Sequence, residues 1–127
     1  MKTLRFIFAA MALSVALGLS AQWSPTKAVF DIEKPIMKVF LPKDDLNTGR
    51  AVVACPGGSY LGHAIGHEGW DWAPFFNRQG IALIVLQYTL PAGDRTKPIA
   101  DAEAAIRLVR DSAEVWHINP SSVGIMG

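Results

Sequence analysis

Short apolar runs, separated by turn-forming residues, follow one another along most of the chain. Two of them, residues 51–55 and 81–86, are apolar at every position, which is typical of strands covered on both faces of a parallel sheet. Residues 36–41 and the shorter stretch 28–32 predict further strands, and residues 123–127 predict one at the end of the sequence. The pattern therefore predicts a sheet built from several short strands.

Two longer segments have helical spacing instead, with apolar side chains three and four residues apart. In residues 68–79 these side chains are Trp72, Phe75 and Phe76. In residues 98–116 they are Ile99, Ala102, Ile106, Val109 and Ala113. Gly80 is placed to end the first helix, and His117 is expected to cap the C-terminal end of the second.

The alternation of strands and helices predicts an α/β domain with a mostly parallel sheet and flanking helices. Helices cover both faces of the central strands in such a domain. No helix follows residues 123–127 in this sequence, so we expect a fold that is incomplete at the C-terminus and exposes apolar surface on its last strand.

Residues 1–21 have the pattern of a secretory signal peptide, with a positive start, the apolar run 6–19 and small residues after it. Cleavage is expected after Ser20 or Ala21. The alternative is an uncleaved anchor, but the apolar run is shorter than the roughly 20 residues of a membrane span. The sequence therefore predicts a secreted or periplasmic protein without a membrane attachment after cleavage, with residues 22–127 forming part of one domain.

Composition narrows the range of functions. The chain has 127 residues and a formal net charge of +1, so it is long enough for one domain and lacks the basic character of a nucleic-acid-binding protein. Its single cysteine, Cys55, cannot form an internal disulfide and fits a small buried apolar side chain.

The predicted strand 51–55 runs into a loop with two adjacent glycines, Gly57 and Gly58. Such a loop turns sharply and can present consecutive N–H groups to a ligand. A dinucleotide site would need G-x-G-x-x-G and a carboxylate after the next strand, where Gln87 and Tyr88 stand, and a phosphate-binding P-loop would need Gly-Lys-Ser/Thr. The readings left open are an oxyanion hole and a plain strand-to-helix turn.

Together with its surroundings this loop resembles those of secreted α/β-hydrolase carbohydrate esterases, such as the acetylxylan and feruloyl esterases of bacterial xylan degradation. The matching segments are ACPGGSY (54–60), HEG (67–69), QYTLP (87–91), DAEAAIR (101–107) and INPSSVGIMG (118–127). Their order and spacing, more than any single motif, carry the resemblance.

The resemblance implies a catalytic triad that is not present in this sequence. In that family the last strand runs into the nucleophile elbow G-x-S-x-G, and Gly127 aligns with its first glycine, so that the serine, the acidic residue and the histidine would all lie beyond it. It assigns the oxyanion hole to the backbone N–H groups of Gly58 and Ser59, with Gly57 shaping the turn. The family usually has a third glycine where this chain has Ser59.

The histidines are weak candidates for a metal site. His63 and His67 are four residues apart, a spacing that places two zinc ligands on one face of a helix, but Gly62 and Gly66 disfavour a helix there and no third ligand is evident. We expect neither a metal nor a cofactor. The resemblance instead favours a structural or pocket-lining role for His67.

Other reactive or aromatic residues have simpler explanations. Ser59 has no evident base beside it to make it a nucleophile, and Asp101 and Glu103 are two apart on a helix, so they point in different directions. Tyr60, next to the oxyanion loop, is the aromatic residue most readily placed at a pocket. A second set of aromatic side chains is expected to lie mostly in the core rather than to form a sugar platform: Trp70, Trp72, Phe75 and Phe76.

The leading interpretation is thus a fragment of a secreted serine carboxylic-ester hydrolase that deacylates plant cell-wall polysaccharide such as xylan. Its substrate in the complete protein would be an acylated polysaccharide or oligosaccharide. The chain alone is expected to be inactive because the triad is absent. The alternative is a small non-catalytic α/β module that binds a nucleotide or sugar through the Gly57-Gly58 loop.

Overall fold

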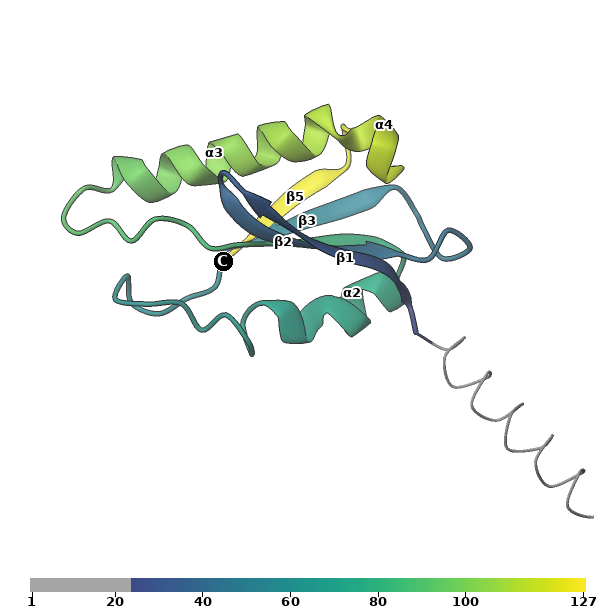
Figure 1. The fold of residues 1–127 in the computed structure, drawn as a ribbon, viewed down its shortest axis with the longest axis horizontal. Coiled ribbons are helices and arrows are strands. Elements are labelled where there is room, and N and C mark those ends of the chain that lie inside the picture. Colours follow the sequence, from purple (N-terminus) through teal and green to yellow (C-terminus); the bar gives the residue numbers. More distant parts are fainter. Residues whose placement is uncertain (1–23) are drawn as a thin grey trace, which may run out of the picture.

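The computed structural model describes residues 24–127, which form a five-stranded sheet in the order β1-β2-β4-β3-β5 (Figure 1). The predicted signal peptide, residues 1–21, lies outside the described residues. The strands are β1 (Thr26–Glu33), β2 (Ile36–Pro42), β3 (Arg50–Ala54), β4 (Ile81–Leu86) and β5 (Val123–Met126). Each lies where the apolar runs predicted a strand.

The sheet is mixed. β3 pairs in parallel with both β4 and β5, whereas β2 pairs antiparallel with β1 and with β4. The difference from a mostly parallel sheet arises at the start of the domain. Only residues 34 and 35 separate β1 from β2, and so short a connection joins antiparallel strands, since parallel neighbours need a crossover of a dozen or more residues. The α/β class with flanking helices is confirmed.

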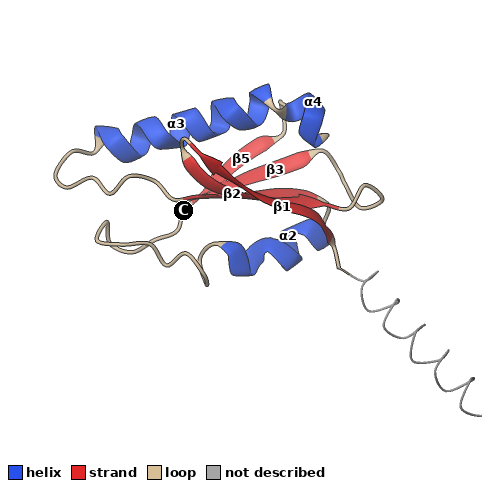
Figure 2. Cartoon of the chain, viewed as in Figure 1, coloured by secondary structure: helices blue, strands red, loops and turns tan. Residues whose placement is uncertain are grey.

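Helices cover the two faces of the sheet (Figure 2). One face carries α3 (Thr96–Asp111) and α4 (Ala113–Trp116), and the other carries the short 3₁₀ helix η1 (Trp70–Trp72) and α2 (Ala73–Arg78). The structure therefore has two helices, separated at Ser112, where the sequence predicted one over residues 98–116. No helix within residues 24–127 is long and apolar enough to cross a membrane.

The aromatic residues of η1 and α2 are more exposed than predicted. Trp70, Trp72 and Phe75 have 38%, 42% and 51% of their surface exposed, and only Phe76 packs partly against the core. The prediction that most of them are core residues is therefore wrong. The reason is that α2 docks on the sheet through Ala73 and Asn77, while the rings of Trp72, Phe75 and Phe76 pack edge-to-face or tilted against one another.

Asn77 anchors α2 to the sheet. It is fully buried, and its amide nitrogen donates to the carbonyl oxygens of Phe40 at 3.1 Å and Ile81 at 2.9 Å. Its side-chain oxygen accepts a hydrogen bond from the hydroxyl of Thr26 at 2.6 Å. One amide therefore ties the helix to β1, β2 and β4, and its burial is compatible with stability because its polar atoms are paired.

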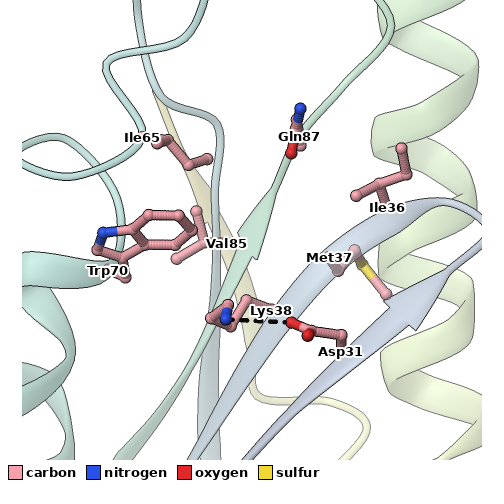
Figure 3. Close-up of a pocket in the computed structure, with 8 residues that line it drawn as sticks. All are labelled: Asp31, Ile36, Met37, Lys38, Ile65, Trp70, Val85 and Gln87. Carbon is pink, nitrogen blue, oxygen red and sulfur yellow. Dashed lines mark ion pairs between the residues drawn. The ribbon is translucent and has the colours of Figure 1, made fainter.

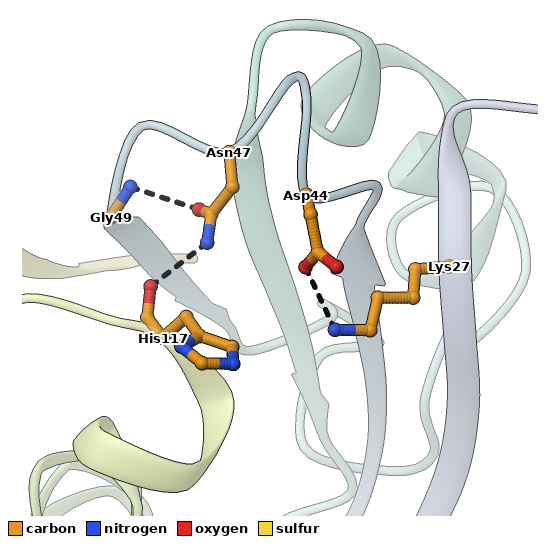
Figure 4. Close-up of polar contacts among 5 residues, drawn as sticks. All are labelled: Lys27, Asp44, Asn47, Gly49 and His117. Carbon is orange, nitrogen blue, oxygen red and sulfur yellow. Dashed lines mark hydrogen bonds and ion pairs between the residues drawn. The ribbon is translucent and has the colours of Figure 1, made fainter.

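Polar contacts fix the loops at the amino ends of β3 and β5 (Figure 4). The side-chain amide of Asn47 donates to the carbonyl of His117 at 2.9 Å, and its oxygen accepts from the N–H of Gly49 at 2.9 Å. His117 ends α4 in a left-handed conformation with φ 55°, at the cap position that the sequence predicted. Lys27 pairs with Asp44 at 2.8 Å in the same region and holds the pKa of that carboxyl below its usual value.

Candidate functional site

An open cleft of about 890 Å³ lies at the carboxyl ends of the parallel strands, where binding sites in α/β sheets are usually found. Its lining comes from the loop after β3, the end of β5, and the connection from β4 into the first turns of α3. These residues are Cys55, Gly57, Gly58, Ser59, Tyr60, Tyr88, Pro91, Gly93, Arg95, Pro98, Ile99, Ala102 and Gly127. The cleft is predominantly apolar, and Arg95 is the one charged side chain in it.

The glycine loop has a backbone conformation that only certain residues tolerate. Gly58 has φ +154°, and a Cβ atom there would lie 2.2 Å from the carbonyl oxygen of Gly62, so a side chain would force the loop to move. Ser59 and Tyr60 follow with φ of 55° and 60°, and Leu61 N–H closes the turn on the Gly58 carbonyl at 3.0 Å. Two consecutive residues with positive φ and this hydrogen bond are typical of a type I′ turn.

Three successive carbonyl groups of the loop, those of Pro56, Gly57 and Gly58, are held by donors. The hydroxyl of Tyr88 donates to the carbonyl of Pro56 at 2.6 Å. Ala64 N–H donates to the carbonyl of Gly57 at 2.7 Å, and the Gly58 carbonyl closes the turn just described. Because N–H and C=O point in opposite directions across a trans peptide, holding each carbonyl also fixes the direction of the next residue's N–H.

Of the three N–H groups in the same peptides, one is hydrogen-bonded to a side chain and two have no partner within the described residues. Gly57 N–H donates to Oε2 of Glu68 at 2.6 Å. The N–H groups of Gly58 and Ser59 have no hydrogen-bond partner among residues 24–127. The loop thus offers two consecutive backbone donors at the cleft, an arrangement that can stabilise a developing negative charge on oxygen.

The electrostatics of the cleft favour neutral side chains around this loop. Burial raises the pKa of the half-buried Cys55 thiol, which keeps it a thiol rather than a nucleophilic thiolate. Burial is also the main cause of the raised pKa of Tyr88, with smaller contributions from Cys55, Tyr60 and Glu68. The Tyr88 hydroxyl therefore remains a hydrogen-bond donor at neutral pH.

Most residues that the sequence predicts at the site line the cleft, and the histidines do not. Gly57, Gly58, Ser59, Tyr60 and Gly127 all line the cleft, and Cys55 N–H donates to the Met126 carbonyl at 2.8 Å, which holds the glycine loop beside the end of β5.

The histidines lie elsewhere. His67 is exposed and does not line the cleft, whereas Nε2 of His63 lies 2.8 Å from the carbonyl oxygen of Tyr88. No cluster of three or more metal-ligating side chains occurs within residues 24–127.

The chain is similar in sequence to a known esterase. An acetylxylan esterase of Xylanibacter ruminicola is 45% identical to it over 125 residues, which cover 97% of this chain and 26% of the relative. The chain thus spans about a quarter of the length of that relative. No family model matches the chain.

Solved structures share the architecture. An α/β-hydrolase enzyme, MGS-M1, from a Medee basin deep-sea metagenome library superposes with a TM-score of 0.71 at 21% identity, over 81% of this chain and 47% of that one. A truncated carbohydrate esterase from gut microbiota gives 0.68 at 21% identity, over 81% and 40%. The chain carries part of an α/β-hydrolase fold. The acetyl ester-xyloside bifunctional hydrolase of Caldicellulosiruptor lactoaceticus gives 0.63 at 24% identity, over 81% and 43%.

The α/β-hydrolase fold accounts for the position of the cleft. In this fold an N–H of the loop after the third strand contributes to the oxyanion hole, and the nucleophile follows a strand at the top of the sheet. Here the glycine loop follows β3, and β3 and β5 are neighbours, so their carboxyl ends meet. The resemblance to α/β-hydrolase carbohydrate esterases that the sequence motifs indicated is confirmed by the relative and the fold.

Sequence analysis missed several cleft residues of this hydrolase fold. Tyr88, Arg95 and Ile99 line the cleft, and Ile99, which the helical spacing predicts on the buried stripe, is 57% exposed. The available signal was their position just beyond the carboxyl end of a parallel strand. Asp101 of α3 is nearby, where its carboxylate accepts the N–H of Thr89 at 2.6 Å and so fixes the connection that carries these residues.

A second, much smaller pocket of about 70 Å³ lies between β1, β2 and the segment before α2 (Figure 3). It contains the ion pair of Lys38 and Asp31 at 3.3 Å, and the Lys38 ammonium lies 5.3 Å from the centre of the Trp70 ring. Because Lys38 already lies against Trp70 and the pocket is smaller than a sugar ring requires, it is a weaker candidate than the cleft.

Proposed function

We propose that this chain is part of a secreted serine carboxylic-ester hydrolase that removes acyl groups from xylan or a related polysaccharide. The observation that carries the proposal is the pair of N–H groups, on Gly58 and Ser59, that lie beside the end of β5 and have no hydrogen-bond partner within residues 24–127. The 45% identity to an acetylxylan esterase supports the ester substrate and its polysaccharide carrier. Secretion rests on the leader sequence, residues 1–21.

The chemistry follows from where the charge develops. A serine beyond Gly127 would attack the ester carbonyl carbon while a histidine takes its proton, and the carbonyl oxygen would become an oxyanion bound by the two N–H groups. Collapse of this intermediate would release the sugar hydroxyl with the proton returned by the histidine. Water would then hydrolyse the acyl-enzyme by the same steps and release the carboxylic acid.

Sequencing the coding DNA beyond the codon for Gly127 is the first test. The proposal expects the next codons to encode a residue, a serine, a residue and a glycine. The product of the whole gene should then release acetate from acetylated xylan, and replacing that serine by alanine should abolish the release. A stop codon directly after Gly127, or full activity without the serine, would contradict the proposal.

The alternative is a non-catalytic binding module that uses the Gly57-Gly58 loop. Titration with nucleotides and with unesterified xylo-oligosaccharides separates the two functions. Saturable nucleotide binding at the glycine loop, without ester hydrolysis by the whole gene product, would favour the module.

A further inference from the structure

The peptide that joins Pro56 to Gly57 is held from both sides by side chains of different segments. Its carbonyl oxygen accepts the hydroxyl of Tyr88 at 2.6 Å, and its N–H donates to the carboxylate of Glu68 at 2.6 Å. Tyr88 follows β4, and Glu68 belongs to the segment that leads into η1. A trans peptide has two strong polar groups at opposite edges, and here both are bound.

The packing around this peptide shows that its position is restricted. Tyr88 is only 7% exposed, and its ring makes an edge contact with His63 at 4.6 Å between centroids. On the other side, a Cβ atom at Gly57 would lie 2.6 Å from Oε2 of Glu68, so the carboxylate lies directly against the backbone. Glu68 itself is exposed, and its carboxylate is a stronger acceptor than a neutral group in the same place would be.

The next peptide in the chain carries the first of the two free donors. Rotating the peptide between Pro56 and Gly57 would change the backbone direction at Gly57 and so re-aim the N–H groups of Gly58 and Ser59. Donors in an oxyanion hole act only when they are within about 2.7–3.1 Å of the reacting oxygen. The orientation of this peptide therefore affects whether the loop can work, together with the hydrogen bonds from Ala64 and Leu61 that hold the carbonyls of Gly57 and Gly58.

We propose that Tyr88 and Glu68 are positioning residues that clamp the Pro56–Gly57 peptide and thereby aim the N–H groups of Gly58 and Ser59 at the cleft. The inference rests on the proposed esterase function for its catalytic consequence. Neither side chain contacts the reacting atoms in this account, because each acts through the same backbone unit.

Kinetics of the whole gene product test the clamp. Tyr88→Phe keeps the ring and removes the hydroxyl, and Glu68→Ala removes the acceptor. Each variant should lower kcat about tenfold or more and leave KM for an acetate ester nearly unchanged, because the donors are needed in the transition state rather than in ground-state binding. Glu68→Gln, whose amide oxygen can still accept the Gly57 N–H, should restore most of the activity.

The double variant separates a shared clamp from two independent defects. Because both residues hold one peptide, Tyr88→Phe combined with Glu68→Ala should cost little more than the worse single change. Multiplicative losses, or an inactive Glu68→Gln variant that is still folded, would overturn the proposal. Glu103→Ala removes an exposed carboxylate that pairs with Arg107 at 3.4 Å on the surface of α3, and serves as the matched control.

Amide hydrogen exchange makes the test independent of catalysis. In the unsubstituted protein the Gly57 N–H should exchange slowly and the Gly58 and Ser59 N–H groups quickly, and Glu68→Ala should speed exchange at Gly57 alone. Fast exchange at Gly57 before any substitution would overturn the clamp. A protected Gly57 in a protein without esterase activity would instead refute the proposed function and leave the clamp standing.

Discussion

At the scale of single residues, catalysis is expected to depend on the backbone of the glycine loop and not on the side chain of Ser59. Ser59→Ala should leave kcat for an acetate ester within a few-fold of the original, because the contribution of Ser59 is its N–H. Gly58→Ala should lower kcat by about 10²–10³, because a Cβ there would lie 2.2 Å from the carbonyl oxygen of Gly62. Assays of both variants in the whole gene product measure the contrast.

The opposite pattern would identify a different chemistry. If Ser59→Ala were inactive while Gly58→Ala retained activity, the Ser59 hydroxyl rather than the backbone would take part in the reaction. Folding is the necessary control, and the far-UV circular dichroism of both variants should match that of the unsubstituted protein.

The family resemblance of the sequence indicated the two donors, but the clamp that aims them could not be predicted. Adjacent glycines after an apolar run are a local signal for a sharp turn, whereas the positive φ of Ser59 and Tyr60 has no signal in the sequence. The hydrogen bonds of Glu68 and Tyr88 join positions that are 11 and 32 residues apart from their partners. No pattern in the sequence encodes such pairings, because they depend on how the loops cross above the sheet.

At the scale of elements, α2 depends on one buried amide. Asn77→Leu should lower the free energy of unfolding by about 2–4 kcal/mol, because the substitution leaves the carbonyls of Phe40 and Ile81 and the hydroxyl of Thr26 without their partner. Urea denaturation measures the change. The exposed Gln79→Ala, two residues along, should change the free energy of unfolding by less than about 0.5 kcal/mol, and equal losses would contradict the role of Asn77.

One exposed carboxylate at the start of α3 should make a small part of the stability of the domain depend on pH. The carboxylate of Asp94 accepts the hydroxyl and the N–H of Thr96 at 2.5 and 3.0 Å, and these bonds lower its pKa from the usual 3.8. A pKa that is lower in the folded state stabilises the fold above pH 3.8, and this contribution is lost as the pH falls through the folded pKa.

Asp94→Asn tests this dependence. The variant should be less stable than the original protein at neutral pH, and the two should converge in urea midpoint as the pH is lowered below about 4. Asp45→Asn, at an exposed site, controls for the change in net charge. A stability difference that stays constant from pH 7 to pH 3 would exclude the ionised Asp94 as the cause.

Helix periodicity located both helices and most of the buried face of α3, where Ala102, Ile106 and Val109 lie in or against the core, but not the face that α2 buries. Trp72, Phe75 and Phe76 have the spacing of an apolar face, yet α2 turns Ala73 and Asn77 toward the sheet. The small Ala73 and the hydrogen-bonding Asn77 allow α2 to approach the sheet closely. A hydropathy scale gives alanine and asparagine lower hydrophobicity than the aromatic residues. The sequence alone therefore favoured the wrong stripe.

At the scale of the whole molecule, alternation of strands and helices was enough to predict the α/β class, and the order of the strands was not. The apolar runs mark each strand independently, whereas β4 lies between β2 and β3 because of how the crossovers pack. That order brings β3 beside β5 and places the glycine loop next to Gly127. The candidate site is thus a consequence of topology, and its residues become neighbours only in the folded chain.

The same molecule should be unable to hydrolyse esters by itself. Within residues 24–127 no serine hydroxyl is hydrogen-bonded to a histidine, and the only histidine ring nitrogen in a hydrogen bond, Nε2 of His63, lies against the carbonyl of Tyr88. A complete triad contributes about 10⁶ to turnover, so the two backbone donors alone should leave a rate about 10⁶-fold below that of the whole gene product. Stopped-flow measurements with an activated acetate ester should show neither a burst nor steady release above the buffer rate. A burst equal in amount to the protein would reveal a nucleophile inside these residues, and its loss in Ser59→Ala would identify it.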